Sequence, residues 1–288
     1  MAYLLKNNYF LAGLIGIGFA VTSFFSCEEV VPPLFAEAVV IDSTYVDPVI
    51  PAAQSRIVLL EDFSGVQCVN CPQANMKAAA IAASNPDNVA VVTLHNYFVG
   101  AYAFSDEDFR NQESYDIDAL LGPTTSWPIG AVNRTQFPSE GAVLLDDDKW
   151  AAFVDIDKVL PPIVNVSVEA TRSGTVITAI INMHFLEEVT GDLALSVMLL
   201  ESDIEDPQLT GSGVDTFYIH EHVLRTMPTP SIGSPISETT EAGRVIIRGY
   251  EIELEPHWNT ENLEVLSFVH RSGVTDKSVL QVAHKTVN

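Results

Sequence analysis

At 288 residues, the chain has room for a removed leader and two domains of ordinary size. Hydrophobic residues make up 47% of the sequence and charged residues 18%, a balance that excludes an intrinsically disordered chain. The formal net charge of −24 argues against nucleic acid and anionic lipid headgroups as partners, because an acidic surface repels both.

The first 26 residues have the features of an export signal. Lys6 precedes an uncharged run over residues 11–25, which is short for a membrane span and typical of a signal sequence. The run ends at Ser26 and Cys27, a pair that resembles a bacterial lipobox, so processing would make Cys27 the lipidated first residue of the mature chain. An uncleaved anchor helix is the alternative. Both interpretations tether the protein to a membrane and export the remainder.

Residues 27–55 are expected to form a tether that holds the folded body off the membrane. Prolines at positions 32, 33, 48 and 51 interrupt regular structure, apart from a short strand around residues 38–42. Glu28 and Glu29 directly follow the predicted lipidation site and resemble the surface-export signal of some Gram-negative lipoproteins. We therefore expect an outer-membrane lipoprotein that is either periplasmic or surface-exposed.

A CxxC motif, Cys68-Val69-Asn70-Cys71, lies between an apolar run and an Ala-rich segment. The run over residues 57–60 predicts a buried strand, and residues 74–83 predict a helix. The junction would place the first sulfur at a helix N-terminus, where backbone N–H groups and the macrodipole favour a thiolate. Pro72 fits the first helical turn, because its missing N–H has no helical partner there.

Three interpretations of the CxxC pair follow from the residues. Dithiol redox chemistry is favoured over an inert structural disulfide. A structural zinc site needs two further Cys or His ligands at similar spacing, and the only other cysteine is Cys27. A metal relay assisted by His95 is the third interpretation. If Cys27 is acylated, Cys68 and Cys71 remain as a pair. In the compartment to which the protein is exported, such a pair can be oxidised or used for thiol–disulfide exchange.

Strands and helices are expected to alternate after the CxxC motif. Residues 89–95 predict a buried parallel strand that ends at His95. This histidine either contacts the CxxC pair or a partner or, more often for such a residue, is a capped loop residue. A helix over 105–121, a strand over 129–134 and a last helix over 149–160 follow. This order predicts a right-handed crossover and a sheet covered on both faces.

The motifs of this region resemble the thioredoxin fold, in which a cis proline before a later strand faces the CxxC pair. The resemblance implies that Trp127–Pro128 is the cis bond. The wider strings LLEDFSGVQCVNCPQA and SWPIGAVNR, together with His95 and the lipobox, resemble the outer-membrane-protein-28-related lipoproteins, in which a tethered thioredoxin-like domain precedes a β-rich domain. Thioredoxins carry Gly-Pro between the cysteines. This chain has Val-Asn there, and Gln67 before the first cysteine, so the resemblance does not give the direction of exchange.

Residues 161–288 predict an antiparallel, immunoglobulin-like β-sandwich. Its apolar runs alternate with period two and are separated by Gly, Asp and Asn turns; they span 163–170, 175–185, 193–200, 245–254, 263–269 and 279–284. A long excursion over 201–243 contains His220 and His222. On a strand, both rings would point to one face, which suits zinc or copper. The favoured alternative places them at the sandwich edge, bonded to loops or packed on the first domain.

The sequence therefore predicts an α/β thioredoxin-like domain over 56–160 and an all-β domain over 161–288. The predicted function is thiol–disulfide exchange with protein thiols and disulfides, without a cofactor: Cys68 attacks, Cys71 resolves, and Pro128 presents backbone to the partner. Trp127 either helps to dock that partner or only packs. The alternative is a non-enzymatic surface lipoprotein in which the CxxC pair is a structural disulfide. No Gly-rich phosphate loop, nucleophile elbow or HExxH motif occurs, and the oligomeric state is not encoded in these patterns.

Overall fold

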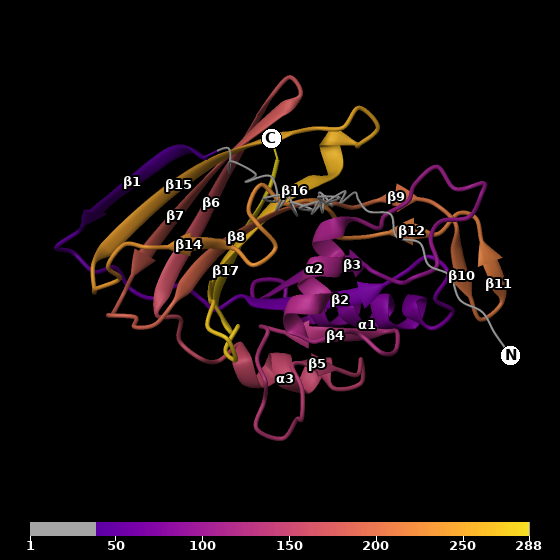
Figure 1. Ribbon diagram of the computed structural model, residues 1–288, viewed down its shortest axis with the longest axis horizontal. Coiled ribbons are helices and arrows are strands. Elements are labelled where there is room, and N and C mark those ends of the chain that lie inside the picture. Colours follow the sequence, from indigo (N-terminus) through magenta and orange to yellow (C-terminus); the bar gives the residue numbers. More distant parts are fainter. Residues whose placement is uncertain (1–38, 288) are drawn as a thin grey trace, which may run out of the picture. The chain divides into compact units, whose positions relative to one another are not determined.

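Two large β-sheets dominate the part of the chain that the structure describes, residues 39–287 of a computed structural model (Figure 1). The predicted signal peptide and the predicted lipidation site, Cys27, lie outside the described residues. Within residues 39–287, no helix is both long and apolar enough to cross a membrane.

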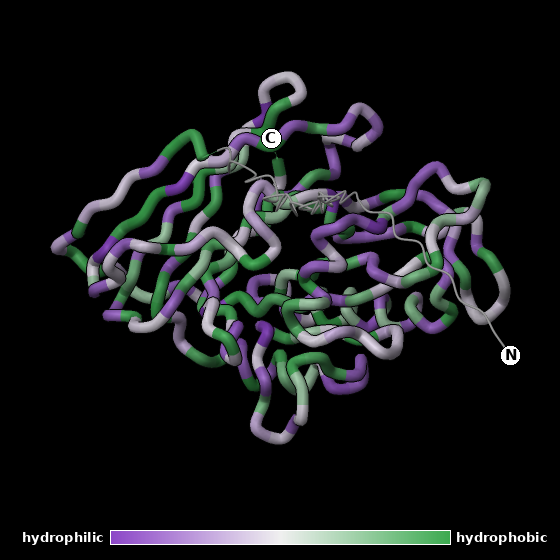
Figure 2. The backbone as a smooth tube through the Cα atoms, viewed as in Figure 1, coloured by the Kyte–Doolittle hydropathy of each residue, from purple (hydrophilic) through white to green (hydrophobic). Residues whose placement is uncertain are grey.

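The smaller sheet has four antiparallel strands in the order β1-β15-β7-β6. Their bounds are β1 Val39–Val46, β15 Arg244–Glu253, β7 Val176–Phe185 and β6 Val164–Ser173. Buried and partly exposed residues alternate along β7, as a period-two pattern requires, and Figure 2 shows the same alternation of hydropathy along this sheet. The predicted strands over 163–170, 175–185 and 245–254 are thus confirmed. β1 lies within the segment expected to be a tether.

The larger sheet has nine strands, with β17-β16-β8-β13-β3-β2-β4-β5 as its main path and β14 paired to β8. Their bounds are β17 Val279–Thr286, β16 Leu263–Arg271, β8 Leu193–Glu201, β13 Val223–Thr226, β3 Val89–His95, β2 Val58–Ser64, β4 Ile129–Val132, β5 Leu144–Leu145 and β14 Ser234–Ile236. β2 and β3 are parallel, and β4 is antiparallel to β2.

One sheet therefore runs through both regions that the sequence treats as separate domains. The junction is the parallel pairing of β13 with β3, where Val223 lies opposite Thr93. The backbone N–H of Thr93 donates to the His222 carbonyl at 2.8 Å, and the Thr93 hydroxyl donates to the Glu221 carbonyl at 2.9 Å. The strand that joins the two regions comes from the long excursion after β8, not from either set of regular strands.

Helices cover both faces of the β2–β3 part of this sheet, as the strand and helix order predicted. They are α1 Cys71–Ser84, α2 Gln112–Leu121 and α3 Trp150–Asp157. The apolar residues of α1 and α3 share a hydrophobic cluster with Val58, Leu60 and Val91. Those of α2 share another with the opposite side chains, Leu59 and Val92. Because successive strand residues point to opposite faces, the two clusters lie on the two sides of the sheet.

The four-stranded sheet and the β8, β16 and β17 strands share a third hydrophobic cluster, which is the arrangement of a β-sandwich. All nine residues of β8 are buried, because its second face contributes Met198 and Leu200 to the cluster beneath α2. A short 3₁₀ helix, η1 Thr260–Asn262, precedes β16. The described chain is mostly β.

Two small hairpin-like pairs fill the excursion after β8. β9 Ile204–Glu205 pairs with β12 Ile219–His220, and β10 Gln208–Thr210 pairs with β11 Gly213–Asp215. The sequence places no strand here apart from the stretch around His220, because pieces of two or three residues are too short to show a period.

The predicted helix over 105–121 is wrong in its first half, since α2 begins only at Gln112. Its N-cap is Asn111, whose side chain accepts from the Ser114 backbone N–H. The preceding residues are held instead by the excursion: the Asp106 N–H donates to Asp206 at 2.9 Å, and Arg225 donates to Glu107 at 2.9 Å. Tertiary contacts override the local helix-start signal.

Gly130 in β4 is required by close packing. A Cβ added there would lie 2.5 Å from the Glu61 carbonyl oxygen and 2.6 Å from Trp150 Cζ2. We expect Gly130→Ala to lower the unfolding free energy by about 1–3 kcal/mol. Gly141→Ala is the matched control, because its Cβ would meet no atom within 4 Å. Equal midpoints for the two variants in urea unfolding would contradict this packing.

Candidate functional site

The two cysteines of the CxxC motif form a disulfide, with the sulfurs 2.07 Å apart. α1 begins at Cys71, so Cys68 lies in the turn before the helix rather than in its first turn. That turn is closed by the Cys68 N–H donating to the Gly65 carbonyl at 3.0 Å. Pro72 occupies the first turn of α1, as expected. Cys68 is 5% exposed and Cys71 0%, so a bulky partner meets neither residue at the surface.

Pro128 lies at the same end of the sheet as this turn. The Trp127–Pro128 peptide bond is cis, as the resemblance to thioredoxins implied. β4 begins one residue later, where Ile129 pairs with Phe63. The register carried one residue further places Pro128 level with Ser64, the last residue of β2 before the CxxC turn.

Aromatic side chains connect Trp127 to the CxxC turn. The Trp127 indole N–H donates to Asn96 at 2.8 Å, and its ring lies edge-on to Tyr97, with ring centroids 5.0 Å apart. Tyr97 in turn packs on Gly65, where an added Cβ would come within 2.1 Å of the Tyr97 Cβ. The next residue, Phe98, is 67% exposed. Trp127 is therefore a packing residue that also borders an exposed aromatic side chain.

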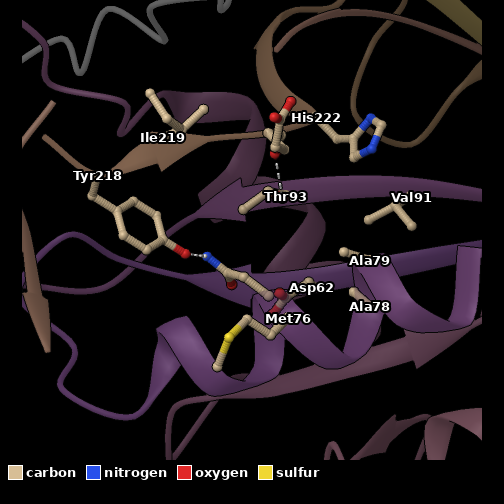
Figure 3. Close-up of a pocket in the computed structure, with 11 residues that line it drawn as sticks. Asp62, Met76, Ala78, Ala79, Val91, Thr93, Tyr218, Ile219 and His222 are labelled. Carbon is tan, nitrogen blue, oxygen red and sulfur yellow. Dashed lines mark hydrogen bonds between the residues drawn. The ribbon is translucent and has the colours of Figure 1, made fainter. Parts of the chain in front are cut away.

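A pocket of about 270 Å³ opens between α1 and the segment after β11 (Figure 3). Figure 3 shows Met76, Ala78 and Ala79 of the helix on one side, with Tyr218, Ile219 and His222 opposite. Strand residues Asp62, Val91 and Thr93 line the rest of it. One wall of the pocket is therefore formed by α1, and the opposite wall by residues of the excursion after β8.

Asp62 is a buried carboxyl that connects this pocket to the CxxC motif. The Asn75 amide, in the orientation that satisfies its neighbours, donates to Asp62 Oδ2 at 2.8 Å and to the Cys71 carbonyl at 3.0 Å. Its oxygen accepts from the Tyr218 hydroxyl at 3.2 Å. Burial, with a smaller contribution from the charge of Asp147, raises the pKa of Asp62 to about 8.

Asp62 is the site residue that the sequence analysis missed. The sequence predicts a strand that ends at the acidic residues 61 and 62, whereas β2 continues through both of them and all seven of its residues are buried. The available signal was a carboxyl six positions before the first cysteine, inside a strand that has apolar residues on both sides. Buried titratable groups with displaced pKa values concentrate at functional sites.

His95 lies in a buried cluster of aromatic and histidine rings. Its ring is buried, with centroids 4.9 Å from Phe109 and 5.8 Å from His220. Burial, reinforced by His220 and Arg225, lowers the pKa of His95 well below its usual range, so the ring is neutral. The aromatic and histidine rings that His95 contacts come from the loop before α2 and from β12.

His220 and His222 do not share one face of a strand. β12 ends at His220, and His222 has a left-handed backbone with φ of 54°. His220 is buried, its Nε2 lies 3.1 Å from the Asp206 carbonyl oxygen, and burial lowers its pKa to about 4. Its ring packs on Phe109, at 4.7 Å. Within residues 39–287, no group of three or more His, Cys, Asp or Glu side chains is arranged to hold a metal ion.

Comparisons with known proteins bear on the C-terminal part and on the fold. A family model described as outer membrane protein Omp28 matches residues 122–288. The solved structure of HBP35 of Porphyromonas gingivalis has a TM-score of 0.64 and 18% sequence identity, covering 82% of this chain and 77% of that one. A domain of the outer membrane lipoprotein Omp28 from Porphyromonas gingivalis is 21% identical over 43% of this chain and 94% of that one, with a TM-score of 0.30. No curated protein matches the chain.

Proposed function

The chain belongs to the Omp28 family of outer membrane proteins, and on that premise we propose that it performs thiol–disulfide exchange at the outer membrane through Cys68 and Cys71. A lipid anchor at Cys27 is part of the proposal, supported by the small residue and cysteine that end the export signal. The partners are protein thiols and disulfides, and the reaction takes no cofactor.

A thioredoxin-like arrangement of the N-terminal region supports this function. Parallel β2 and β3 are linked through α1, and the antiparallel β4 follows a cis proline. The CxxC motif lies between β2 and α1. The likeness in fold to HBP35 extends over most of the described chain. Because fold alone does not determine function, the proposal depends on the site.

The observation that carries the proposal is the pairing of a short-range disulfide with a buried carboxyl. Cys68 and Cys71 are bonded at the start of α1, and Asn75 links the Cys71 backbone to Asp62, whose pKa is raised to about 8. A structural staple needs no such neighbour. A disulfide that takes up and releases protons with each cycle gains from one, because the carboxyl changes its charge near the working pH.

The proposed exchange proceeds in two steps. A partner thiolate attacks Cys68 Sγ and forms a mixed disulfide; the Cys68–Cys71 bond breaks, and its electron pair leaves on Cys71 Sγ, which takes up a proton. The partner's second thiolate then attacks the partner's first sulfur, the one bonded to Cys68 in the mixed disulfide. Cys68 leaves as a thiolate, which is protonated in turn. The partner dithiol becomes a disulfide, and the CxxC pair gains two electrons. In the reverse direction, Cys68 attacks a partner disulfide and Cys71 resolves the intermediate.

We expect the reduction potential of the Cys68–Cys71 pair to lie between roughly −270 and −120 mV, the span of known exchange proteins. The measurement equilibrates the purified full-length protein in glutathione and dithiothreitol buffers and separates oxidised from reduced chains after alkylation. With a potential in this span, Cys71→Ser should accumulate mixed disulfides through Cys68. Cys68→Ser is the matched control and should accumulate far fewer, because Cys71 is fully buried. A potential below about −300 mV would refute exchange.

A non-enzymatic role is the second candidate, and the burial of the disulfide favours it. Cys68 and Cys71 are 5% and 0% exposed, so an unopened chain presents no sulfur to a partner protein. In that case the disulfide staples the turn before α1, and the protein acts as a binding component of the outer membrane. The potential decides between the two roles, because structural disulfides resist reduction by the glutathione pool.

A further inference from the structure

The CxxC turn is held from outside by the β10–β11 hairpin, residues Gln208–Asp215. The Leu209 backbone N–H donates to the Val66 carbonyl at 2.7 Å. The Gln208 amide nitrogen donates to the Cys68 carbonyl at 3.2 Å and to the Gly65 carbonyl at 3.3 Å. Gln208 is fully buried, although it comes from a surface excursion more than 130 residues away along the chain. β10 also packs against α1, the helix that begins at Cys71.

These contacts hold the turn that carries Cys68, the residue that an attacking thiolate must reach. Exchange requires the incoming sulfur to approach the disulfide in line with the bond that breaks, and access limits its rate. With Cys68 only 5% exposed, the closed structure does not provide that approach. Residues Gly65, Val66 and Cys68, which form the turn, are the residues that the hairpin binds.

The hairpin is built so that it can move without unfolding its surroundings. β10 and β11 form a sheet of their own, joined by three residue pairs and to no further strand (Figure 1). An isolated two-stranded hairpin is only marginally stable in water. All three residues of β11 are exposed, as is Phe217 at 73%. Gln208 Oε1 is buried with no hydrogen-bond partner among residues 39–287, which weakens the closed state.

The base of the hairpin, in contrast, is fixed. The strand before the hairpin, β9, pairs with the strand after it, β12. The Asp206 N–H donates to the Tyr218 carbonyl at 3.0 Å. The Asp206 carboxylate accepts from the Asp106 N–H, and the Asp206 backbone carbonyl oxygen contacts His220. Opening would therefore be confined to residues between these anchors, and local opening of this kind costs far less than global unfolding.

We propose that the β10–β11 hairpin is a cover that must lift from the turn 65–68 before a partner's thiolate can reach the Cys68–Cys71 bond. The partner is an extended, cysteine-containing polypeptide segment. When the hairpin lifts, the Val66 carbonyl loses its donor and the Gly65 and Cys68 carbonyls lose the Gln208 amide, and the backbone N–H groups of an extended segment supply replacements. This inference rests on the proposed exchange function and adds the step that controls access to it.

The test measures how fast dithiothreitol reduces the disulfide in the purified full-length protein, by alkylating samples over time and resolving them by mass. Gln208→Ala removes the two side-chain bonds to the turn, and Leu209→Pro removes the backbone donor to Val66. Each should speed reduction about fivefold, since a net hydrogen bond is worth about that factor in an opening equilibrium. Ser212→Ala changes only the exposed turn between β10 and β11 and is the matched control.

Two further readouts make the result decisive. The reduction potential of each variant should equal that of the parent, because the cover governs access and not the redox equilibrium. In the parent protein, hydrogen exchange at the Leu209 amide should report opening at a free energy well below that of global unfolding, a result that needs no variant to fold. Reduction rates that match the parent in both folded variants would overturn the cover. A potential as low as that of structural disulfides, with the rates still accelerated, would instead overturn the proposed function alone.

Discussion

Arg134→Met will lower the free energy of unfolding by about 3–5 kcal/mol, because it leaves Glu61 as an unpaired charge in the interior. The guanidinium donates to Glu61 through Nη2 at 2.6 Å and through Nε at 3.0 and 3.1 Å. Both side chains are 0% exposed. Arg134 also lies over the Phe268 ring, 4.8 Å from its centroid, and methionine preserves part of that apolar contact. The measurement is urea unfolding followed by tryptophan fluorescence.

Two further variants separate the buried charge from the packing. Lys77→Met removes one partner of the Lys77–Asp147 ion pair, in which the lysine side chain is 46% exposed, and should cost less than about 1 kcal/mol. Combining Arg134→Met with Glu61→Leu removes both buried charges and should recover most of the loss, since apolar replacement of a whole buried pair is often neutral. If Arg134→Met costs no more than Lys77→Met, the buried pair does not stabilise the fold in this way.

Stability will peak near pH 6.5 and fall on both sides. On the acid side, burial lowers the pKa of His270 to about 3 and that of His220 to about 4, and it lowers that of His95 in the same direction. Between those values and 6.5, the unfolded chain binds more protons than the folded one, so acidification favours unfolding. His270 and His220 are each worth roughly 3–5 kcal/mol across this window, and His95 acts in the same direction. Asp62 opposes the trend, because the folded chain holds a proton on this carboxyl that the unfolded chain has lost. One proton does not cancel the effect of three histidines.

On the alkaline side, the sign reverses because Asp62 keeps its proton in the folded state. With a folded pKa of about 8 against 3.8 in the unfolded chain, its contribution to stability is lost steadily as the pH rises toward 8. From pH 6.5 to 8 the loss is about 2 kcal/mol. His284, whose pKa is raised by its hydrogen bond to Glu264, declines in the same direction.

Urea midpoints measured from pH 4 to 9 check both limbs. Asp62→Asn should flatten the alkaline limb and leave the acid limb in place, while His270→Asn should reduce the acid slope only. Slopes are compared rather than absolute stabilities, because either substitution also changes buried hydrogen bonds. An alkaline slope that survives in Asp62→Asn would show that another group carries it.

The sequence predicted elements best where one periodic segment determines one element. Residues 71–84 are helical as predicted, because the Ala-rich run and Pro72 favour the same structure. The period-two runs after residue 161 became strands of the two packed sheets. In contrast, the helix-start signal at 105–108 lost to contacts with Asp206 and Arg225, which lie about 100 residues further along the chain.

The same contrast between local patterns and long-range contacts applies to the candidate site. The CxxC motif is a local feature with recognisable residues, and the resemblance to the thioredoxin fold implied the cis Trp127–Pro128 bond that the structure contains. The Cys68 turn is bonded by Gln208 of the distant excursion, and the pKa of Asp62 is raised because α1 and neighbouring strands bury it. Neither follows from spacing, because each arises where segments distant in sequence meet.

The parallel pairing of β13 with β3 has a consequence for how the chain matures after export. The N-terminal half emerges from the translocation machinery first, yet β3 has no neighbour on one side until Val223 arrives. Until then its open edge can pair with the strands of other chains. Long-range pairing of this kind slows folding and lengthens the exposure of that edge. Newly exported molecules are thus expected to depend on periplasmic holding factors until the excursion after β8 has been delivered.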